Sequence, residues 1–126
     1  MQNSDSCPCC LSLTYEQCCK PYHDGALCPT AEKLMRSRYT AYVLCLPTYL
    51  IATTFPSKRK GLSEQEIIDW STENKWTKLE IVKASKSMVE FKAHFTDAQN
   101  QDYVHHELST FSFDKGKWYY VKGSFY

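Results

Sequence analysis

Residues 89–95, Val-Glu-Phe-Lys-Ala-His-Phe, alternate apolar and polar side chains without a break. A period of two over this length is typical of an antiparallel strand with one face buried and the other in water. Outward from this stretch, Leu79 and Ile81 begin an earlier strand, while 103–113 and 118–121 have the composition of two later ones. The C-terminal half therefore predicts a meander of antiparallel strands.

The N-terminal half has helical signals instead. Thr30 is an N-cap residue for a helix that we expect to run to about Leu46, and a shorter helical piece is expected over 47–54. Ser63 and Glu66 form a capping box that opens a further helix, to about Glu73. Helices followed by a strand meander predict an α+β fold.

The composition of the chain limits the classes of function that we expect. The chain has 126 residues with 15 Lys and Arg against 14 Asp and Glu, a length that fits one domain with a small added module. No apolar run approaches the roughly 18 residues that span a bilayer, and residues 1–6 do not resemble an export signal. We therefore expect a cytoplasmic protein with no membrane partner. The near-zero net charge and the short basic stretch 58–60 also make nucleic acid an unfavoured partner.

Cysteine is the unusual residue, because five of the seven cysteines lie within residues 7–19. An odd number without an export signal favours metal ligands over disulfides. Two tight pairs, Cys7-Pro8-Cys9 and Cys18-Cys19, supply the four thiolates that a tetrahedral zinc site requires. The sequence predicts one structural zinc ion held by Cys7, Cys9, Cys18 and Cys19. Such a closed site has no open position for a catalytic water.

Alternatives to this ligand set remain open. Cys10 can replace Cys9 or stay free, and His23 is close enough in sequence to replace a cysteine. The surplus thiols also leave a redox role open. Cys28 and Cys45 are interpreted as small hydrophobic residues.

The first long helix carries a charge on its apolar side. At about 100° per residue, Arg38 falls near the middle of the apolar arc, whereas Arg36 lies off the arc and is expected to meet water. A buried guanidinium needs anionic or carbonyl partners. Strand alternation places His105, Glu107 and Ser109 on one face, and Glu107 is the expected partner of Arg38.

Several stretches together resemble a known family. The C-x-C-x8-C-C spacing of Cys7 to Cys19 resembles the SEC-C zinc motif at the tail of the SecA translocase. Together with residues 21–25 (Pro-Tyr-His-Asp-Gly), 30–42 (Thr-Ala-Glu-Lys-Leu-Met-Arg-Ser-Arg-Tyr-Thr-Ala-Tyr) and 105–107 (His-His-Glu), it is similar to the YchJ family of uncharacterised bacterial proteins. That family has glycine where this chain has Cys10. The resemblance implies a SEC-C-like zinc knuckle over 1–28 and a nuclear transport factor 2-like (NTF2-like, cystatin-like) domain over 29–126. In such a domain a cone of helices packs on a curved antiparallel sheet.

The resemblance also has implications for the function. A cone of this kind implies a pocket at its open end, lined by Arg38, Tyr39, Tyr42, His105 and Glu107, and the competing interpretation is a sealed Arg38–Glu107 ion pair. We expect a non-enzymatic, zinc-binding accessory protein that binds a protein partner through the zinc knuckle or a small ligand. The alternative is a small-molecule enzyme or binding domain that uses this pocket.

Overall fold

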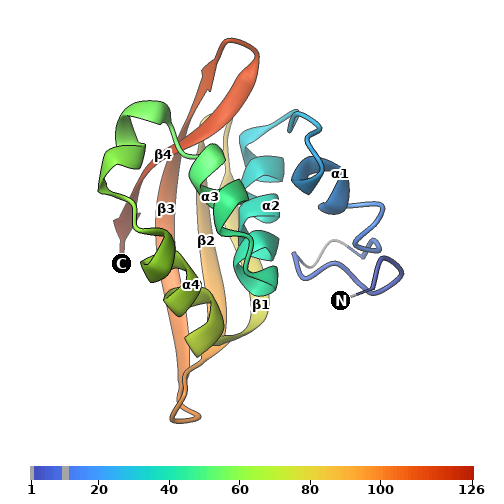
Figure 1. The fold of residues 1–126 in the computed structure, drawn as a ribbon, viewed down its shortest axis with the longest axis vertical. Helices are drawn as coiled ribbons and strands as arrows, with labels where there is room; N and C mark the ends of the chain where they lie inside the picture. The colour runs from blue at the N-terminus through green and yellow to red at the C-terminus, as the bar shows by residue number, and fades with distance from the viewer. Residues whose placement is uncertain (1, 10–11) are drawn as a thin grey trace.

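The computed structural model describes residues 2–9 and 12–126, so Cys10, considered above as a ligand, lies outside the described residues. The elements follow one another in the order helices, then strands (Figure 1). They are α1 (Lys20–His23), α2 (Ala31–Leu44), α3 (Pro47–Ala52), the 3-10 helix η1 (Pro56–Gly61), α4 (Glu64–Glu73), β1 (Lys75–Ala84), β2 (Met88–Thr96), β3 (Asp102–Asp114) and β4 (Lys117–Phe125).

Within the described residues, the four strands form one antiparallel sheet in the order β1-β2-β3-β4. Helices α2, α3 and α4 cover one face of this sheet, and α1 with the N-terminal segment lies beside α2 (Figure 1). The predicted α+β fold, with helices packed on an antiparallel sheet, is confirmed. No helix in the described part of the chain is long and apolar enough to cross a membrane.

Both predicted helix caps are present. The Thr30 side chain accepts a hydrogen bond from the backbone N–H of Lys33 at 3.1 Å, and the Ser63 side chain accepts one from Glu66 at 3.2 Å. Helix α2 ends at Leu44, slightly before the predicted end, because the next residue, Cys45, adopts a left-handed conformation with φ of 58°. Its backbone N–H then bonds carbonyl groups of the last turn, which is the usual way a helix is closed.

The outer strands are longer than predicted. β1 begins at Lys75 rather than Leu79, and β4 continues to Phe125 rather than ending at Val121. These extensions have no clear alternation of their own and pair with residues on β2 and β3. Strand length at a sheet edge therefore depends on the neighbouring strand, which the local pattern does not contain.

Helix α2 is the centre of the core. Leu34 on α2 is 1% exposed and packs in one cluster with the buried cysteines of the N-terminal segment and with inward residues of the sheet, such as Phe91. A smaller cluster joins Ala41 of α2 to α3 and α4. The cysteine segment therefore packs against the same helix as the sheet.

Helix α4 depends on its cap, which gives a direct test. Ser63→Ala should lower the free energy of unfolding by about 1 kcal/mol, since it leaves the Glu66 N–H without its side-chain acceptor. Urea unfolding followed by circular dichroism measures the change. Ser57→Ala, at an exposed position in η1, is the control and should leave the midpoint unchanged. Equal midpoints for the two variants would contradict the cap.

Candidate metal centre and ligand pocket

Four buried sulfur atoms gather beside α2. The Sγ atoms of Cys7, Cys9, Cys18 and Cys19 all lie within 4.8 Å of one another, with 3.4 Å between Cys9 and Cys18 and 3.9 Å between Cys18 and Cys19. These separations are far longer than the roughly 2.05 Å of a disulfide. They bracket the distance of about 3.8 Å between two sulfurs in a tetrahedral site with zinc–sulfur bonds of about 2.3 Å. The donor set and its spacing therefore fit one shared metal ion.

Local backbone hydrogen bonds bring the two cysteine pairs together. The N–H of Cys7 donates to the carbonyl of Leu13 at 2.8 Å, which closes the loop between the pairs. The second pair leads directly into α1, whose N-cap residue is Cys19. From α2, the Thr40 hydroxyl lies 3.7 Å from the sulfur of Cys7. The site is thus held between a short loop, a short helix and one side of α2.

Burial and mutual hydrogen bonds shift the pKa values of these thiols in opposite directions, since hydrogen bonds with Cys19 and Cys9 lower the pKa of Cys7. Desolvation raises the pKa of Cys18, and the hydrogen bond with Cys7 raises the pKa of Cys19. Metal ligation requires thiolates, so metal binding at this site must release protons. All four thiols are also buried, which distinguishes them from an exposed reactive thiol.

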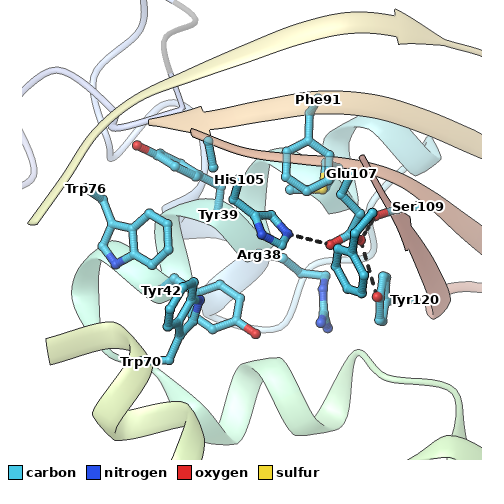
Figure 2. Close-up of a pocket in the computed structure, with 13 residues that line it drawn as sticks. Arg38, Tyr39, Tyr42, Trp70, Trp76, Phe91, His105, Glu107, Ser109 and Tyr120 are labelled. Carbon is cyan, nitrogen blue, oxygen red and sulfur yellow. Dashed lines mark hydrogen bonds and ion pairs between the residues drawn. The ribbon is translucent and has the colours of Figure 1, made fainter. Parts of the chain in front are cut away.

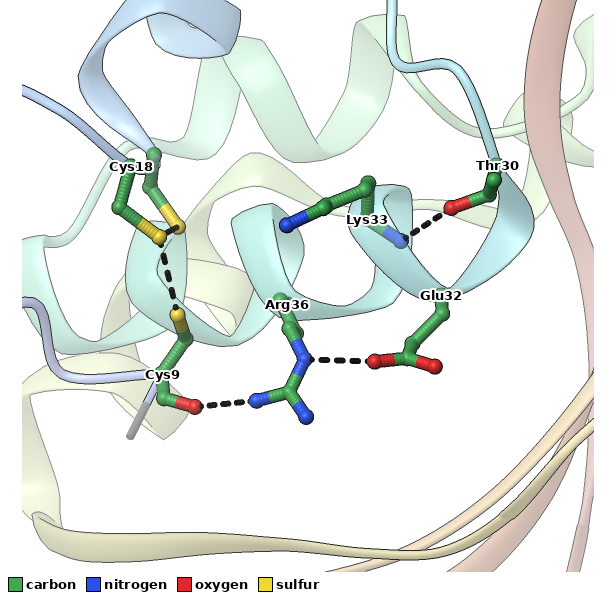
Figure 3. A network of polar contacts seen from close by, with 7 residues as sticks. Cys9, Cys18, Thr30, Glu32, Lys33 and Arg36 are labelled. Atoms are coloured by element: carbon green, nitrogen blue, oxygen red, sulfur yellow. Dashed lines mark hydrogen bonds and ion pairs between the residues drawn. The ribbon is translucent and has the colours of Figure 1, made fainter. Parts of the chain in front are cut away.

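Arg36 contacts the cysteine segment, and the prediction that it meets water is wrong. Its Nη1 donates to the carbonyl of Cys9 at 2.6 Å, and its Nε donates to Glu32 at 3.0 Å (Figure 3). A helical projection treats α2 alone, whereas in the folded chain the cysteine segment covers this side. Lys20, the cation beside the second cysteine pair, instead pairs with Asp24 at 2.6 Å.

His23 is engaged elsewhere, so the structure does not support it as a ligand. Its Nε2 lies 2.8 Å from the carbonyl of Ser37, to which only a protonated nitrogen can donate. Its Nδ1 lies 2.8 Å from the hydroxyl of Tyr15. Cys28 is buried near Ser37, as expected of a small hydrophobic residue.

A cavity of about 230 Å³ lies between α2, α4 and the sheet (Figure 2). Aromatic side chains that the sequence did not single out, including Trp70, Trp76, Phe91 and Phe125, form much of its wall. The structure brings the five predicted pocket residues to this one cavity: Arg38, Tyr39, Tyr42, His105 and Glu107.

Glu107 is the centre of a polar network at the cavity wall. One carboxylate oxygen lies 2.8 Å from Nε2 of His105, and the other accepts hydrogen bonds from Ser109 and, at 3.3 Å, from Tyr120 (Figure 2). Burial pushes the pKa of Glu107 upward, but the hydrogen bonds from His105, Ser109 and Tyr120 outweigh it, so the pKa lies below its usual range. Glu107 is therefore a buried carboxylate with both oxygens occupied.

This network also determines the histidine tautomer. A carboxylate only accepts hydrogen bonds, so Nε2 of His105 is the ring nitrogen that carries the proton in this contact. The alternation predicted for β3 is confirmed here, because β2 and β3 pair without a bulge from Asp102 to Thr110. The hydrogen bond to the carboxylate therefore fixes the orientation of the imidazole ring at the cavity wall.

Arg38 is buried, as predicted, but its expected ion pair with Glu107 is wrong. Nη1 donates to the carbonyl of Leu50 at 2.9 Å, to the Thr53 hydroxyl at 2.7 Å and to the Thr54 hydroxyl at 3.4 Å. The guanidinium carbon lies 4.5 Å from the ring centroid of Tyr120, a cation–π contact. Among the described residues, Arg38 and Glu107 are connected only through Tyr120, whose hydroxyl bonds the carboxylate.

Residues 30–123 match the family model described as YchJ, middle NTF2-like domain. The chain belongs to the YchJ family. It is 43% identical to a UPF0225 protein of Actinobacillus succinogenes, over 91% of this chain and 79% of that protein. It is 41% identical to one of Vibrio parahaemolyticus, over 97% of this chain and 76% of that protein.

Two solved structures resemble this YchJ-family chain closely. A crystal structure of a SEC-C motif containing protein from Psychrobacter arcticus has a TM-score of 0.84 at 38% identity, over 97% of this chain and 84% of that one. A solution structure of a SEC-C motif containing protein from Rhodopseudomonas palustris has a TM-score of 0.86 at 32% identity, over 94% and 96%. The four-cysteine cluster described above is consistent with this motif.

Gly123 makes room for the buried carboxylate of this YchJ-family pocket. It pairs with Ser109 across β3 and β4, and the side chain of Glu107 lies directly over it. A β-carbon at Gly123 would lie 2.5 Å from Cδ of Glu107, well inside van der Waals contact. A glycine inside a strand is a sequence signal for such a close approach, although it does not identify the approaching side chain.

Gly123→Ala should therefore destabilise the YchJ-family fold by about 1–3 kcal/mol, because Glu107 is held by three hydrogen bonds and cannot move freely. Gly61→Ala is the matched control, since a β-carbon there meets nothing within 4 Å. Chemical unfolding of both variants measures the difference. Equal stability of the two would show that the carboxylate is not confined as described.

Proposed function

We propose that this protein binds a small molecule in the cavity between α2, α4 and the sheet, and that its four-cysteine segment holds one structural zinc ion. The observation that carries the proposal is a cavity with aromatic walls that contains a buried guanidinium and a buried carboxylate bonded to a half-buried histidine. Buried charges are costly, and a purely structural core has no need of them beside an unfilled space.

The size of the cavity supports a small ligand. A cavity of about 150 Å³ is enough to bind benzene in a protein core, and this one is about 230 Å³. Pockets that bind small molecules combine apolar walls with a few converging polar groups. Here Trp70, Trp76 and Phe91 supply the walls, while Arg38 and His105 supply polar groups.

A structural role for the ion is supported by the position of the thiols. Cys7, Cys9, Cys18 and Cys19 are buried in the core cluster around α2, and zinc with four thiolate ligands has no position left for water. Two side chains of this segment that a docked partner could contact are already engaged within the chain. Lys20 is paired with Asp24, and Tyr22 is half-buried against the core. We therefore favour the pocket as the functional surface.

The metal proposal has a direct test. Purified under reducing conditions, the wild-type protein should contain about one zinc ion per chain by elemental analysis, and Cys19→Ser should lose it because three thiolates bind zinc more weakly than four. Cys45→Ser is the control and should retain the ion, since Cys45 is half-buried at the end of α2. A wild-type protein without metal would overturn the proposal.

The pocket proposal is tested by filling the cavity. Small aromatic probes (phenol, indole and benzoate) should shift amide NMR signals of β3 around His105, and Ala93→Leu should abolish these shifts because Ala93 is 3% exposed and lines the cavity. Ala84→Leu, at an exposed position near the end of β1, is the control and should retain them. Shifts that survive Ala93→Leu would place binding elsewhere and overturn the proposal.

A further inference from the structure

We propose that the ligand of this pocket is a small carboxylate with an apolar, ring-sized body, whose carboxylate group binds the free edge of the Arg38 guanidinium. This inference rests on the proposed small-molecule function and names the chemical class of the ligand. The observation behind it is that the three nitrogen atoms of Arg38 differ in the number of hydrogen bonds they make.

Within residues 2–9 and 12–126, hydrogen bonds are made to only one nitrogen of Arg38. Nη1 donates to Leu50, Thr53 and Thr54, whereas Nε and Nη2 make no hydrogen bond with any described residue. Arg38 is only 7% exposed and lines the cavity. In the described part of the chain, no side-chain nitrogen or oxygen that is shut off from solvent lacks a hydrogen-bond partner. Nε and Nη2 are therefore reachable, and the cavity is the space that they face.

The free edge has the geometry of a carboxylate receptor. Nε–H and Nη2–H of a guanidinium point in the same direction as a planar fork, which matches the two oxygens of a carboxylate. The third nitrogen, Nη1, is held in place by its three acceptors, and the guanidinium carbon lies over the ring of Tyr120. The fork is thus oriented before a ligand arrives, which lowers the entropy cost of binding.

The charge of Arg38 is also uncompensated by an ion pair. The three oxygen atoms that it contacts are neutral, and no salt bridge to Arg38 is present among residues 2–9 and 12–126. Desolvation lowers the pKa of Arg38, which reflects the cost of its burial. The charge of Glu107 favours the guanidinium through space, but Glu107 forms no ion pair with Arg38, and its two oxygens are occupied by His105, Ser109 and Tyr120. An anionic ligand would supply the missing counter-ion.

The remaining features of the cavity limit the charge and the size of the anion that it can bind. One unpaired guanidinium and a carboxylate on the same wall, Glu107, favour a ligand with a single negative charge over a phosphate dianion. The aromatic walls formed by Trp70, Trp76 and Phe91 favour an apolar body, and the volume of about 230 Å³ limits that body to about one ring with short substituents. Benzoate is the simplest probe with these properties.

The first experiment needs no mutation. Binding of benzoate, benzamide and phenyl phosphate to the zinc-loaded wild-type protein is measured by NMR titration and calorimetry at neutral pH. Benzamide has nearly the shape of benzoate but no charge. We expect benzoate to bind at least about tenfold more tightly than benzamide, since a charge-assisted pair replaces a neutral contact. Phenyl phosphate should bind more weakly than benzoate.

Two arginine variants test whether Arg38 causes the preference for benzoate over benzamide. Arg38→Gln should remove the preference for benzoate over benzamide. Arg59→Gln is the matched control, because Arg59 donates to the carbonyls of Ala52 and Thr54 in the same region, carries the same charge and does not line the cavity. It should retain the preference. If Arg38→Gln does not fold, the wild-type comparison of the two probes decides the question.

The outcomes separate this inference from the proposed function. Equal binding of benzoate and benzamide, with shifts at the pocket, would overturn the carboxylate inference and leave the small-molecule function standing. Tighter binding of phenyl phosphate than of benzoate would also overturn it, in favour of a phosphate ligand. The absence of pocket shifts with every probe would overturn the proposed function itself, and this inference with it.

Discussion

The burial of Arg38 is the constraint on which the arrangement around α2 depends. A guanidinium removed from water must keep its hydrogen bonds. The end of α3 provides them through Leu50, Thr53 and Thr54, and β4 provides the ring of Tyr120. Satisfying one nitrogen in this way positions α3 and β4 relative to α2. The rest of the group is left facing a cavity, so the same residue organises the core and gives the pocket its polarity.

Helix α2 serves two sites on different sides. Arg36 and Arg38 are two residues apart, which turns their side chains by about 200° around the helix axis. Arg36 donates to the carbonyl of Cys9 beside the four thiols, whereas Arg38 lines the cavity. A metal ion bound to the cysteines would therefore hold the N-terminal segment against the helix that also carries the pocket. The four-cysteine cluster and the cavity are separated in space but share one helix.

Some features of this protein followed from local patterns alone. The spacing of Cys7, Cys9, Cys18 and Cys19 was sufficient to predict a cluster, because two tight pairs joined by a short loop need little help from the rest of the chain. The caps at Thr30 and Ser63 were equally readable, since an N-cap contact reaches only three residues along the chain. The helical period likewise placed Arg38 in the core.

By itself, the sequence determined the class of fold, the cysteine quartet and the residues that share the inner face of β3, because these depend on spacing and periodicity. Only the tertiary structure decided the distant partners of Arg36 and Arg38. The oxygens around Arg38 come from residues 50–54, the ring beside it from Tyr120, and the carbonyl beside Arg36 from Cys9. These groups are distant along the chain and meet only when α3, β4 and the cysteine segment pack around α2. Helical periodicity shows which side chains leave water, whereas the packing of distant elements decides what those side chains contact.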